Sequence, residues 1–307
     1  MKTTKLLWII VFNLLIIVSE IVFGLISNSF ALIADALHNT GDVIAVIITY
    51  LAIKLAAKKA SFSHTFGYLR AEMMAAFVNT LFLFITMLYM IYEAINRFYN
   101  PEIIEPIYMI IVGLIAVIAN GVSAYILNNM GVATCSHNHS DHGHHHHDHE
   151  DANIKSAYLH MLLDALISVG VVIAGIFIYY FKIYYIDSIL TIVFSLYILK
   201  HSYPLLKKSF LSLMDINIVE IDEKTLCELI ISDERVLEYH DLHISKPNSK
   251  YNFISFHIVL NDEKLSLVEC ESITDIIRKK LKHNGFNHIL IQVDTDKNLK
   301  NHTNCSI

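Results

Sequence analysis

Long apolar runs dominate the first two thirds of the chain. A helix that crosses the hydrocarbon core of a bilayer needs about 20 mostly apolar residues, and six segments before residue 210 reach that length. They are Leu6–Ile26, Phe30–Ala57, Met73–Ile95, Ile104–Leu127, Ala157–Phe181 and Ile186–Leu206. The first is too long for a signal peptide and lacks an A-x-A-like cleavage site, so we interpret it as an anchor. The pattern predicts an all-α transmembrane domain of six helices over residues 1–210.

Basic residues are distributed unevenly over the loops between these segments. Cytoplasmic loops are enriched in Lys and Arg, and one set of loops carries only Arg97 and Lys182. The other set carries Lys2, Lys5, Lys54, Lys58, Lys59, Arg70, Lys155, Lys200, Lys207 and Lys208. This asymmetry predicts that both termini are cytoplasmic. The absence of a targeting segment favours a multi-pass protein of the bacterial plasma (inner) membrane.

After Asp215 the pattern becomes that of a soluble domain. The elements we expect are a helix over Asp222–Ser232, strands over Val236–Ser245 and Tyr251–Leu260, a helix from Ser266 to about His283, and a strand over Asn287–Thr295. Ser266 and Glu269 match a capping box, and Gly285 is a helix stop signal. The order αββαβ predicts a small cytosolic α+β domain over residues 211–307.

Composition narrows the class of protein. Of the 307 residues 54% are hydrophobic and 17% are charged, whereas soluble domains carry about 25% charged residues. A net charge of −6 argues against a nucleic-acid partner, because phosphate binding needs a basic stripe. The four cysteines form no C-x-x-C pair, which argues against a disulfide framework. Without a phosphate-binding Gly-rich loop or a nucleophile–base arrangement, the chain is not predicted to be an enzyme.

A histidine-rich segment, residues 130–153, joins the fourth and fifth apolar runs on the side predicted to be cytoplasmic. Its histidines are His137, His139, His142, His144, His145, His146, His147 and His149. Such a composition cannot bury a core, so we expect disorder. An embedded expression tag would lack the interspersed Asp141, Asp148, Glu150 and Asp151. The segment is therefore interpreted as a metal-capture loop.

The pattern L-H-x-x-x-D occurs in two different apolar runs. It places His38 with Asp42 and His160 with Asp164. Residues four apart share one helical face, so two facing helices offer two nitrogen and two oxygen ligands, which suits tetrahedral Zn²⁺. Ionisable residues at membrane depth are costly and usually functional. Polar residues can also join helices by hydrogen bonds, but two matched pairs favour a metal site.

The charge of this ligand set suggests an exchange mechanism. With neutral imidazoles the two carboxylates give a charge of −2, which one Zn²⁺ or protons can cancel. A site that alternates between zinc and protons is an antiporter. Asp35 lies three residues before His38 and is interpreted either as a partner that orients the imidazole or as a helix-end charge. Glu20 and Asn13 are interpreted as interhelical hydrogen-bonding residues.

Further motifs accompany these pairs and extend over nearly the whole chain. They are Ser27–Asp42, Thr65–Glu72, Ala157–Asp164, His240–His243 and Ile291–Asp294. In these motifs the chain resembles the cation diffusion facilitator (CDF) family, in its CzcD-like zinc-transporter subgroup. The resemblance implies a homodimeric Zn²⁺/H⁺ antiporter with six spans per subunit that exports zinc from the cytosol. His38, Asp42, His160 and Asp164 match the family's transport site, where a histidine at the first position goes with zinc preference.

The resemblance also implies roles outside the transport site. Arg70 and Asp215 match a charge pair that locks the dimer, although a positive-inside charge and a helix-end charge explain them too. The C-terminal domain resembles a metallochaperone and would mediate dimerisation. His240, His257, His288 and Asp294 match the family's cytosolic zinc sites, which would hold structural or regulatory Zn²⁺. Ser245 and Asp294 depart from the family's usual Trp and Glu.

One part of the cytosolic site also follows from the strand pattern. If the hairpin is symmetric about residues 248–249, His240 lies directly opposite His257, and opposed residues have Cβ atoms about 4.5–5.5 Å apart. A histidine pair on a sheet can also be ordinary surface.

The competing functions are a non-transporting zinc-binding regulatory subunit, or metal sensor, and a membrane-tethered metallochaperone. The two intact H-x-x-x-D pairs favour zinc efflux across the lipid bilayer.

Overall fold

The computed structural model describes residues 2–56, 58–134, 148–262 and 264–294. Its helices and strands are α1 (Lys2–Ser27), α2 (Phe30–Ala56), α3 (Ala71–Tyr99), α4 (Pro106–Thr134), α5 (Asp148–Phe181), α6 (Tyr185–Leu213), α7 (Glu223–Ile230), β1 (Val236–Ser245), β2 (Phe253–Leu260), α8 (Leu267–His283) and β3 (His288–Asp294). Each predicted apolar run thus corresponds to one helix. Most of the metal-capture loop, including His137 to His147, lies outside the described residues.

Two compact units make up the chain. The first contains Met1–Ile44 and Asn79–Tyr203, and the second contains Ala45–Val78 and Pro204–Ile307. The first unit is built from helices, and the second contains the only described β-sheet. The two halves of the H-x-x-x-D pattern fall in the first unit.

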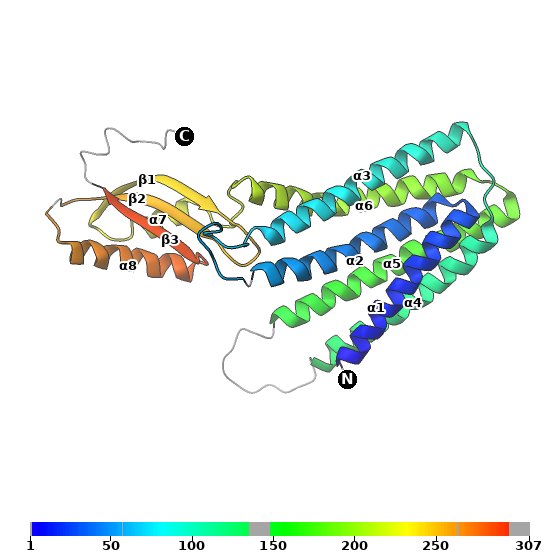
Figure 1. Cartoon of the computed structure of the whole chain (residues 1–307), viewed down its shortest axis with the longest axis horizontal. Coiled ribbons are helices and arrows are strands. Elements are labelled where there is room, and N and C mark those ends of the chain that lie inside the picture. Colours follow the sequence, from blue (N-terminus) through cyan, green and yellow to red (C-terminus); the bar gives the residue numbers. More distant parts are fainter. Residues whose placement is uncertain (1, 57, 135–147, 263, 295–307) are drawn as a thin grey trace. The chain divides into compact units, whose positions relative to one another are not determined.

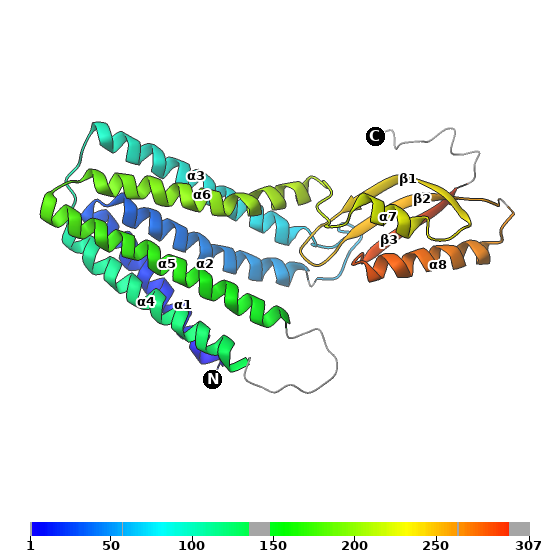
Figure 2. The same cartoon turned by 180° about the vertical axis from the view of Figure 1, so that it is seen from behind.

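The helices of the first unit pack closely through small residues. Helices α1, α4 and α5 lie side by side in both views (Figures 1 and 2). A Cβ added to Gly113 would lie 2.8 Å from Val172 Cγ2, and one added to Gly175 would lie 2.8 Å from Ile110 Cγ1. Small residues allow helix backbones to approach closely in membranes, so these glycines set the spacing of α4 and α5.

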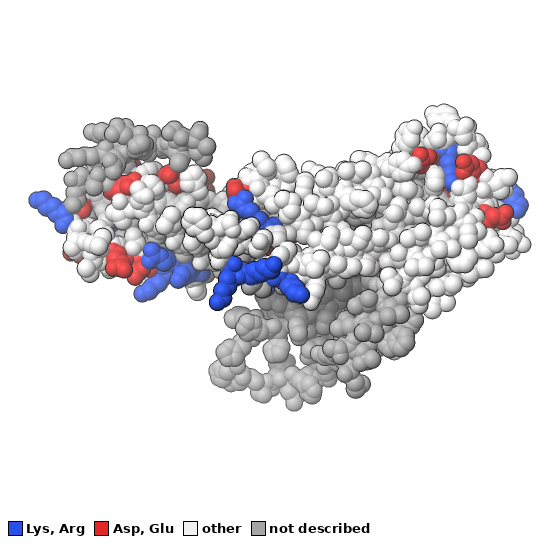
Figure 3. All heavy atoms as spheres, viewed as in Figure 1, with Lys and Arg blue, Asp and Glu red and all other residues white. Residues whose placement is uncertain are grey.

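Within the described residues, five helices have the length and composition needed to cross a membrane. They are Phe30–Ala52, Ala71–Tyr99, Pro106–Ile126, Met161–Phe181 and Tyr185–Leu213, and Asn13–Ser27 is a shorter apolar segment of α1. Large apolar side chains such as Leu25, Ile118 and Leu166 are more than half exposed. On the face shown in Figure 3, charged side chains are nearly absent from the flanks of these helices. The exposed apolar surface indicates contact with lipid, because soluble monomers rarely expose large apolar patches.

The sheet in the second unit has the strand order β1-β2-β3. Strands β1 and β2 are antiparallel, and β2 and β3 are parallel. Helices α7 and α8 cover one face (Figures 1 and 2), where a core forms around Ile254, Phe256, Ile258, Ile273 and Ile277. The predicted order αββαβ and the capping box at Ser266 are confirmed.

Candidate metal centres

Three side chains of the two H-x-x-x-D pairs lie close together inside the first unit. His38 Nε2 is 3.7 Å from Asp42 Oδ2 and 3.8 Å from Asp164 Oδ1. The first contact follows from the i, i+4 spacing on α2, and the second joins α2 to α5. Ligand atoms of one tetrahedral Zn²⁺ lie about 3.3 Å apart, given metal–ligand bonds of about 2.0–2.2 Å. This group, called the His38 cluster below, therefore has nearly the spacing of ligands around one ion.

Exposure within the His38 cluster is graded. The side chain of Asp164 is 4% exposed, that of His38 is 11% exposed and that of Asp42 is 38% exposed. Asp164 and His38 are thus almost completely buried, and Asp42 is the member of the cluster with the most exposed side chain. His160 lies on α5 one turn before Asp164, but its side chain is outside those that the structure describes.

Buried polar contacts surround the His38 cluster. Ser168 Oγ donates to the backbone oxygen of Asp164 at 3.0 Å and to Asp35 Oδ2 at 3.5 Å. Asn39 Nδ2 donates to Glu20 Oε2 at 3.1 Å, which joins α2 to α1. The interhelical role predicted for Glu20 is confirmed. Asp35 is 2% exposed and contacts α5 through Ser168, so its carboxylate helps to hold α2 and α5 together.

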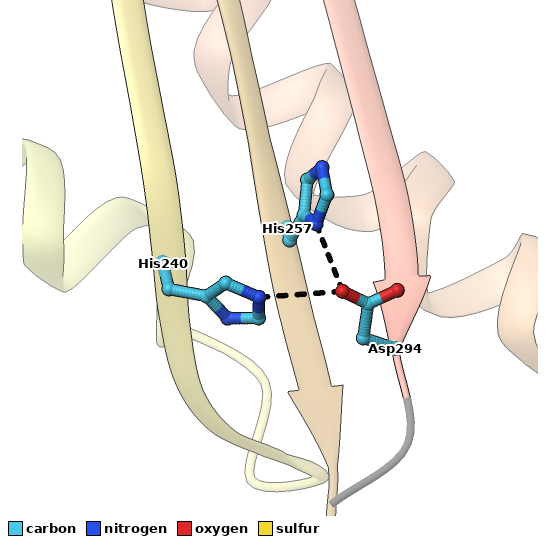
Figure 4. Close-up of side chains that lie close together, drawn as sticks. All are labelled: His240, His257 and Asp294. Atoms are coloured by element: carbon cyan, nitrogen blue, oxygen red, sulfur yellow. Dashed lines mark hydrogen bonds and ion pairs between the residues drawn. The ribbon is translucent and has the colours of Figure 1, made fainter. Parts of the chain in front are cut away.

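A second group forms in the sheet domain and is shown in Figure 4. His257 Nδ1 lies 2.8 Å from Asp294 Oδ2, and His240 Nε2 lies 3.2 Å from the same oxygen. One ligand atom from each residue falls within 4.8 Å of the others. The register pairs His240 with His257, as predicted, and pairs Val259 with Asp294. Three strands thus bring together these three half-buried residues, called the His240 cluster below.

The carboxyl group of Asp294 is held in its ionised form. Burial alone raises its pKa, but hydrogen bonds from Gln292 and His257, together with the charges of His257 and His240, outweigh burial and lower the pKa below its usual value. An ionised carboxylate between two imidazoles is a donor set suited to Zn²⁺.

His288 lies apart from the His240 cluster, at the opposite end of β3. Its ring is 4.9 Å from that of Phe253 and 6.4 Å from that of Phe66, measured between centroids. Each strand residue advances about 3.3 Å, so the six steps from His288 to Asp294 correspond to about 20 Å. The structure therefore does not bring His288 to the other three predicted ligands.

Asp241 makes contacts with two histidines that the sequence pattern did not predict. The strand register shifts between His240 and His243, and Asp241 has a φ of 53°. This bulge brings the Asp241 carboxylate to 3.1 Å from His243 Nε2 and 3.7 Å from His257 Nε2. A regular alternation would place Asp241 on the opposite face of the sheet from His240 and its partner His257, so the bulge explains the contact with His257.

Arg70 and Asp215 form an ion pair within the second unit, in which one guanidinium nitrogen contacts both carboxylate oxygens. Arg70 Nη2 lies 2.5 Å from Asp215 Oδ1 and 2.7 Å from Oδ2, and both side chains are about half exposed. Only the family resemblance predicted that these two residues form a pair. The contact within one chain is now visible, whereas its role in a dimer stays a prediction.

Comparison with known protein families identifies the chain. Residues 6–214 match the cation efflux transmembrane domain, and residues 218–296 match the cytoplasmic domain of cation efflux proteins. The chain belongs to the cation efflux family. This confirms the resemblance inferred from the motifs. As a cation efflux protein the chain is a multi-pass membrane transporter rather than an enzyme, and its cytoplasmic domain is of the kind through which such proteins dimerise.

Several named cation efflux relatives align over most of the chain. The "Cadmium, cobalt and zinc/H(+)-K(+) antiporter" of Bacillus subtilis (strain 168) is 34% identical over 285 residues, which is 93% of this chain and 86% of the relative. "Zinc transporter ZitB" of Pectobacterium atrosepticum is 32% identical over 81% of this chain and 73% of the relative. "Metal cation efflux system protein CzcD" of Cupriavidus metallidurans is 30% identical over 91% and 82%.

Proposed function

We propose that this protein exports Zn²⁺ in exchange for protons, and that His38, Asp42, His160 and Asp164 hold the ion during transport. The observation that carries the proposal is the His38 cluster, in which one imidazole lies between carboxylates from two membrane helices. The names of the relatives support zinc as cargo and protons as a counter-ion. Two nitrogen and two oxygen ligands suit zinc and do not by themselves exclude cobalt or cadmium.

Proton exchange follows from the chemistry of the ligands. Zinc binds neutral imidazole and ionised carboxylate, so loading the site releases any protons held there. Protons that enter from the other side reload the same ligands and expel the metal. No phosphate-binding loop supplies energy, so the ion gradient drives transport.

The arrangement in the membrane is part of the proposal. We infer six spans, with α1 as the sixth beside the five long apolar helices, and cytoplasmic termini in a plasma (inner) membrane. We further infer a homodimer. The ion pair between Arg70 and Asp215 supports a rigid junction after α6.

The Arg70–Asp215 pair is expected to contribute about 1 kcal/mol of coupling energy, the upper end for exposed ion pairs. A double-mutant cycle with Arg70→Ala, Asp215→Ala and the double variant measures it through thermal unfolding, and cross-linking reports the dimer fraction. Asp215 has a φ of 55°, but the strain of alanine there cancels in the cycle. Strictly additive effects on both readouts would argue against the pair.

We also propose that the His240 cluster binds a second Zn²⁺ in the cytoplasmic domain. Replacing Asp294 by asparagine is expected to lower bound zinc by about one ion per subunit, because the neutral amide is a poor zinc ligand. Equilibrium dialysis of the full-length protein measures the loss. Asp275→Asn, an exposed carboxylate on α8, is the matched control, and equal zinc content in both variants would contradict the site.

A further inference from the structure

A buried arginine connects several segments at one end of the helical unit. Arg97, near the end of α3, has 7% of its side chain exposed. Its Nη1 donates to the backbone oxygen of Asn28 at 2.5 Å, and its Nη2 donates to Asn28 Oδ1 at 2.6 Å and to Glu102 Oε2 at 3.2 Å. The guanidinium lies 3.8 Å from Asp187 Oδ2 and 3.4 Å from the centre of the Phe30 ring. We call these five residues the Arg97 latch.

Asp187 fixes the first turn of α2 from another helix. It lies in the first turn of α6 and is fully buried. Its Oδ2 accepts a hydrogen bond from the Phe30 N–H at 2.9 Å, and its Oδ1 accepts from Ser29 Oγ at 2.6 Å and from the Ala31 N–H at 3.3 Å. N–H groups of a first helical turn have no partner within the helix, and a carboxylate there is stabilised by the helix dipole. Asp187 therefore holds the start of α2 to α6.

The latch lies on the closed side of the His38 cluster. Both belong to the first unit, and α2 links them directly. Asp35 and His38, the polar residues of α2 nearer to Phe30, are 2% and 9% exposed, whereas the side chain of Asp42, farther along α2, is 38% exposed. With a rise of about 1.5 Å per residue, His38 lies about 12 Å along α2 from Phe30. In this conformation the cluster is covered toward the latch and open away from it.

We propose that the Arg97 latch is the gate on the side of the membrane where the metal leaves. The proposal rests on the transport function proposed above. A transporter that alternates between two sides must close one end of its site while the other is open. The latch joins the start of α2 to α3, to the α3–α4 link and to α6, so its release would free the ligand-bearing helix at that end.

The chemistry of the latch suits a contact that opens. Glu102 has 55% of its side chain exposed and also accepts a hydrogen bond from Asn28 Nδ2 at 2.6 Å, so water reaches the rim of the network. Opening exchanges hydrogen bonds within the protein for hydrogen bonds to water, a change with a small net free energy. A tightly packed apolar contact would lose its packing outright.

Ser188 provides a reporter for the opening of the latch. Ser188 is 2% exposed and lines the same small cavity as Arg97 and Glu102. In full-length protein whose four native cysteines are replaced by serine, Ser188→Cys should react slowly with a water-soluble maleimide. Adding Glu102→Ala should raise that labelling rate by about five- to tenfold, because a latch partner is removed. Glu105→Ala, an exposed glutamate of the same link, is the matched control and should leave the rate unchanged.

Transport kinetics distinguish a latch that opens during transport from one that only stabilises the folded protein. If Glu102→Ala lowers the fraction of molecules facing the loading side, the apparent zinc KM rises in proportion, while kcat is not lowered. Glu102→Gln, which keeps the size but not the charge, should shift both readouts in the same direction. Equal labelling rates and equal KM values in the Glu102→Ala and Glu105→Ala proteins would overturn the proposal. Labelling needs no metal transport, so absent zinc flux with latch-dependent labelling would count only against the proposed function.

Discussion

Replacing His38 by alanine is expected to lower zinc flux by at least about 100-fold. Zinc binding to a four-ligand site is worth about 10–16 kcal/mol in structural sites, so the loss of one ligand of four removes several kcal/mol. His38 is the side chain that contacts both Asp42 and Asp164, so its loss removes the imidazole between the two carboxylates. The measurement is initial zinc uptake into proteoliposomes at matched protein content.

His201→Ala is the control for that experiment. His201 lies on α6, is exposed and stacks against Tyr197 with ring centroids 6.2 Å apart. It has the same side chain on a helix of the same unit but lies outside the His38 cluster, so its flux should stay within about twofold of wild type. Equal loss in the two variants would mean that the effect is not specific to the cluster.

The second large effect concerns pH. Between pH 7.5 and 5.5 the affinity of the transport site for zinc is expected to fall by at least about tenfold, because the reference pKa of histidine is about 6.5 and protonated imidazole cannot bind metal. Titration calorimetry in detergent measures it, in a protein with residues 137–149 deleted and His240 and His257 replaced by alanine. An affinity that stays constant over this range would contradict proton exchange.

Asp294 should not add to the pH dependence in that range. Its pKa is lower in the folded protein than in the unfolded chain, so the stability that it contributes is present above about pH 4 and disappears as the pH falls through the folded value. Between pH 5.5 and 7.5 it is ionised throughout.

Periodicity predicted most of the helices and the nature of the sheet domain. Apolar runs of about 20 residues can only become long helices in lipid, because every backbone group must be paired internally. The predicted ends of the helices were less accurate. The fifth run was predicted from Ala157, whereas α5 begins at Asp148, since a helix continues past the membrane when nothing in the sequence stops it. The cross-strand pairing of His240 with His257 was predicted from the hairpin.

The candidate sites divide in the same way. The contact of His38 with Asp42 followed from a four-residue spacing, which a helix converts directly into proximity, whereas the contact of His38 with Asp164 needs two helices to face each other. Asp241 depends on a bulge, and the contact between Asp187 and Ser29 joins residues 158 positions apart. No local pattern encodes either contact. In the sequence Arg97 is only a basic residue of a predicted loop, and its partners come from segments that only the fold brings together.

Zinc uptake into proteoliposomes under an imposed pH gradient tests the central claim most directly, with wild type measured beside Asp42→Ala and Asp164→Ala. We expect gradient-driven uptake in the wild type, its collapse when an ionophore dissipates the gradient, and no uptake in either variant. A wild type that binds zinc through its cytoplasmic domain but shows no gradient-driven flux would contradict the account and would favour a regulatory, zinc-sensing subunit.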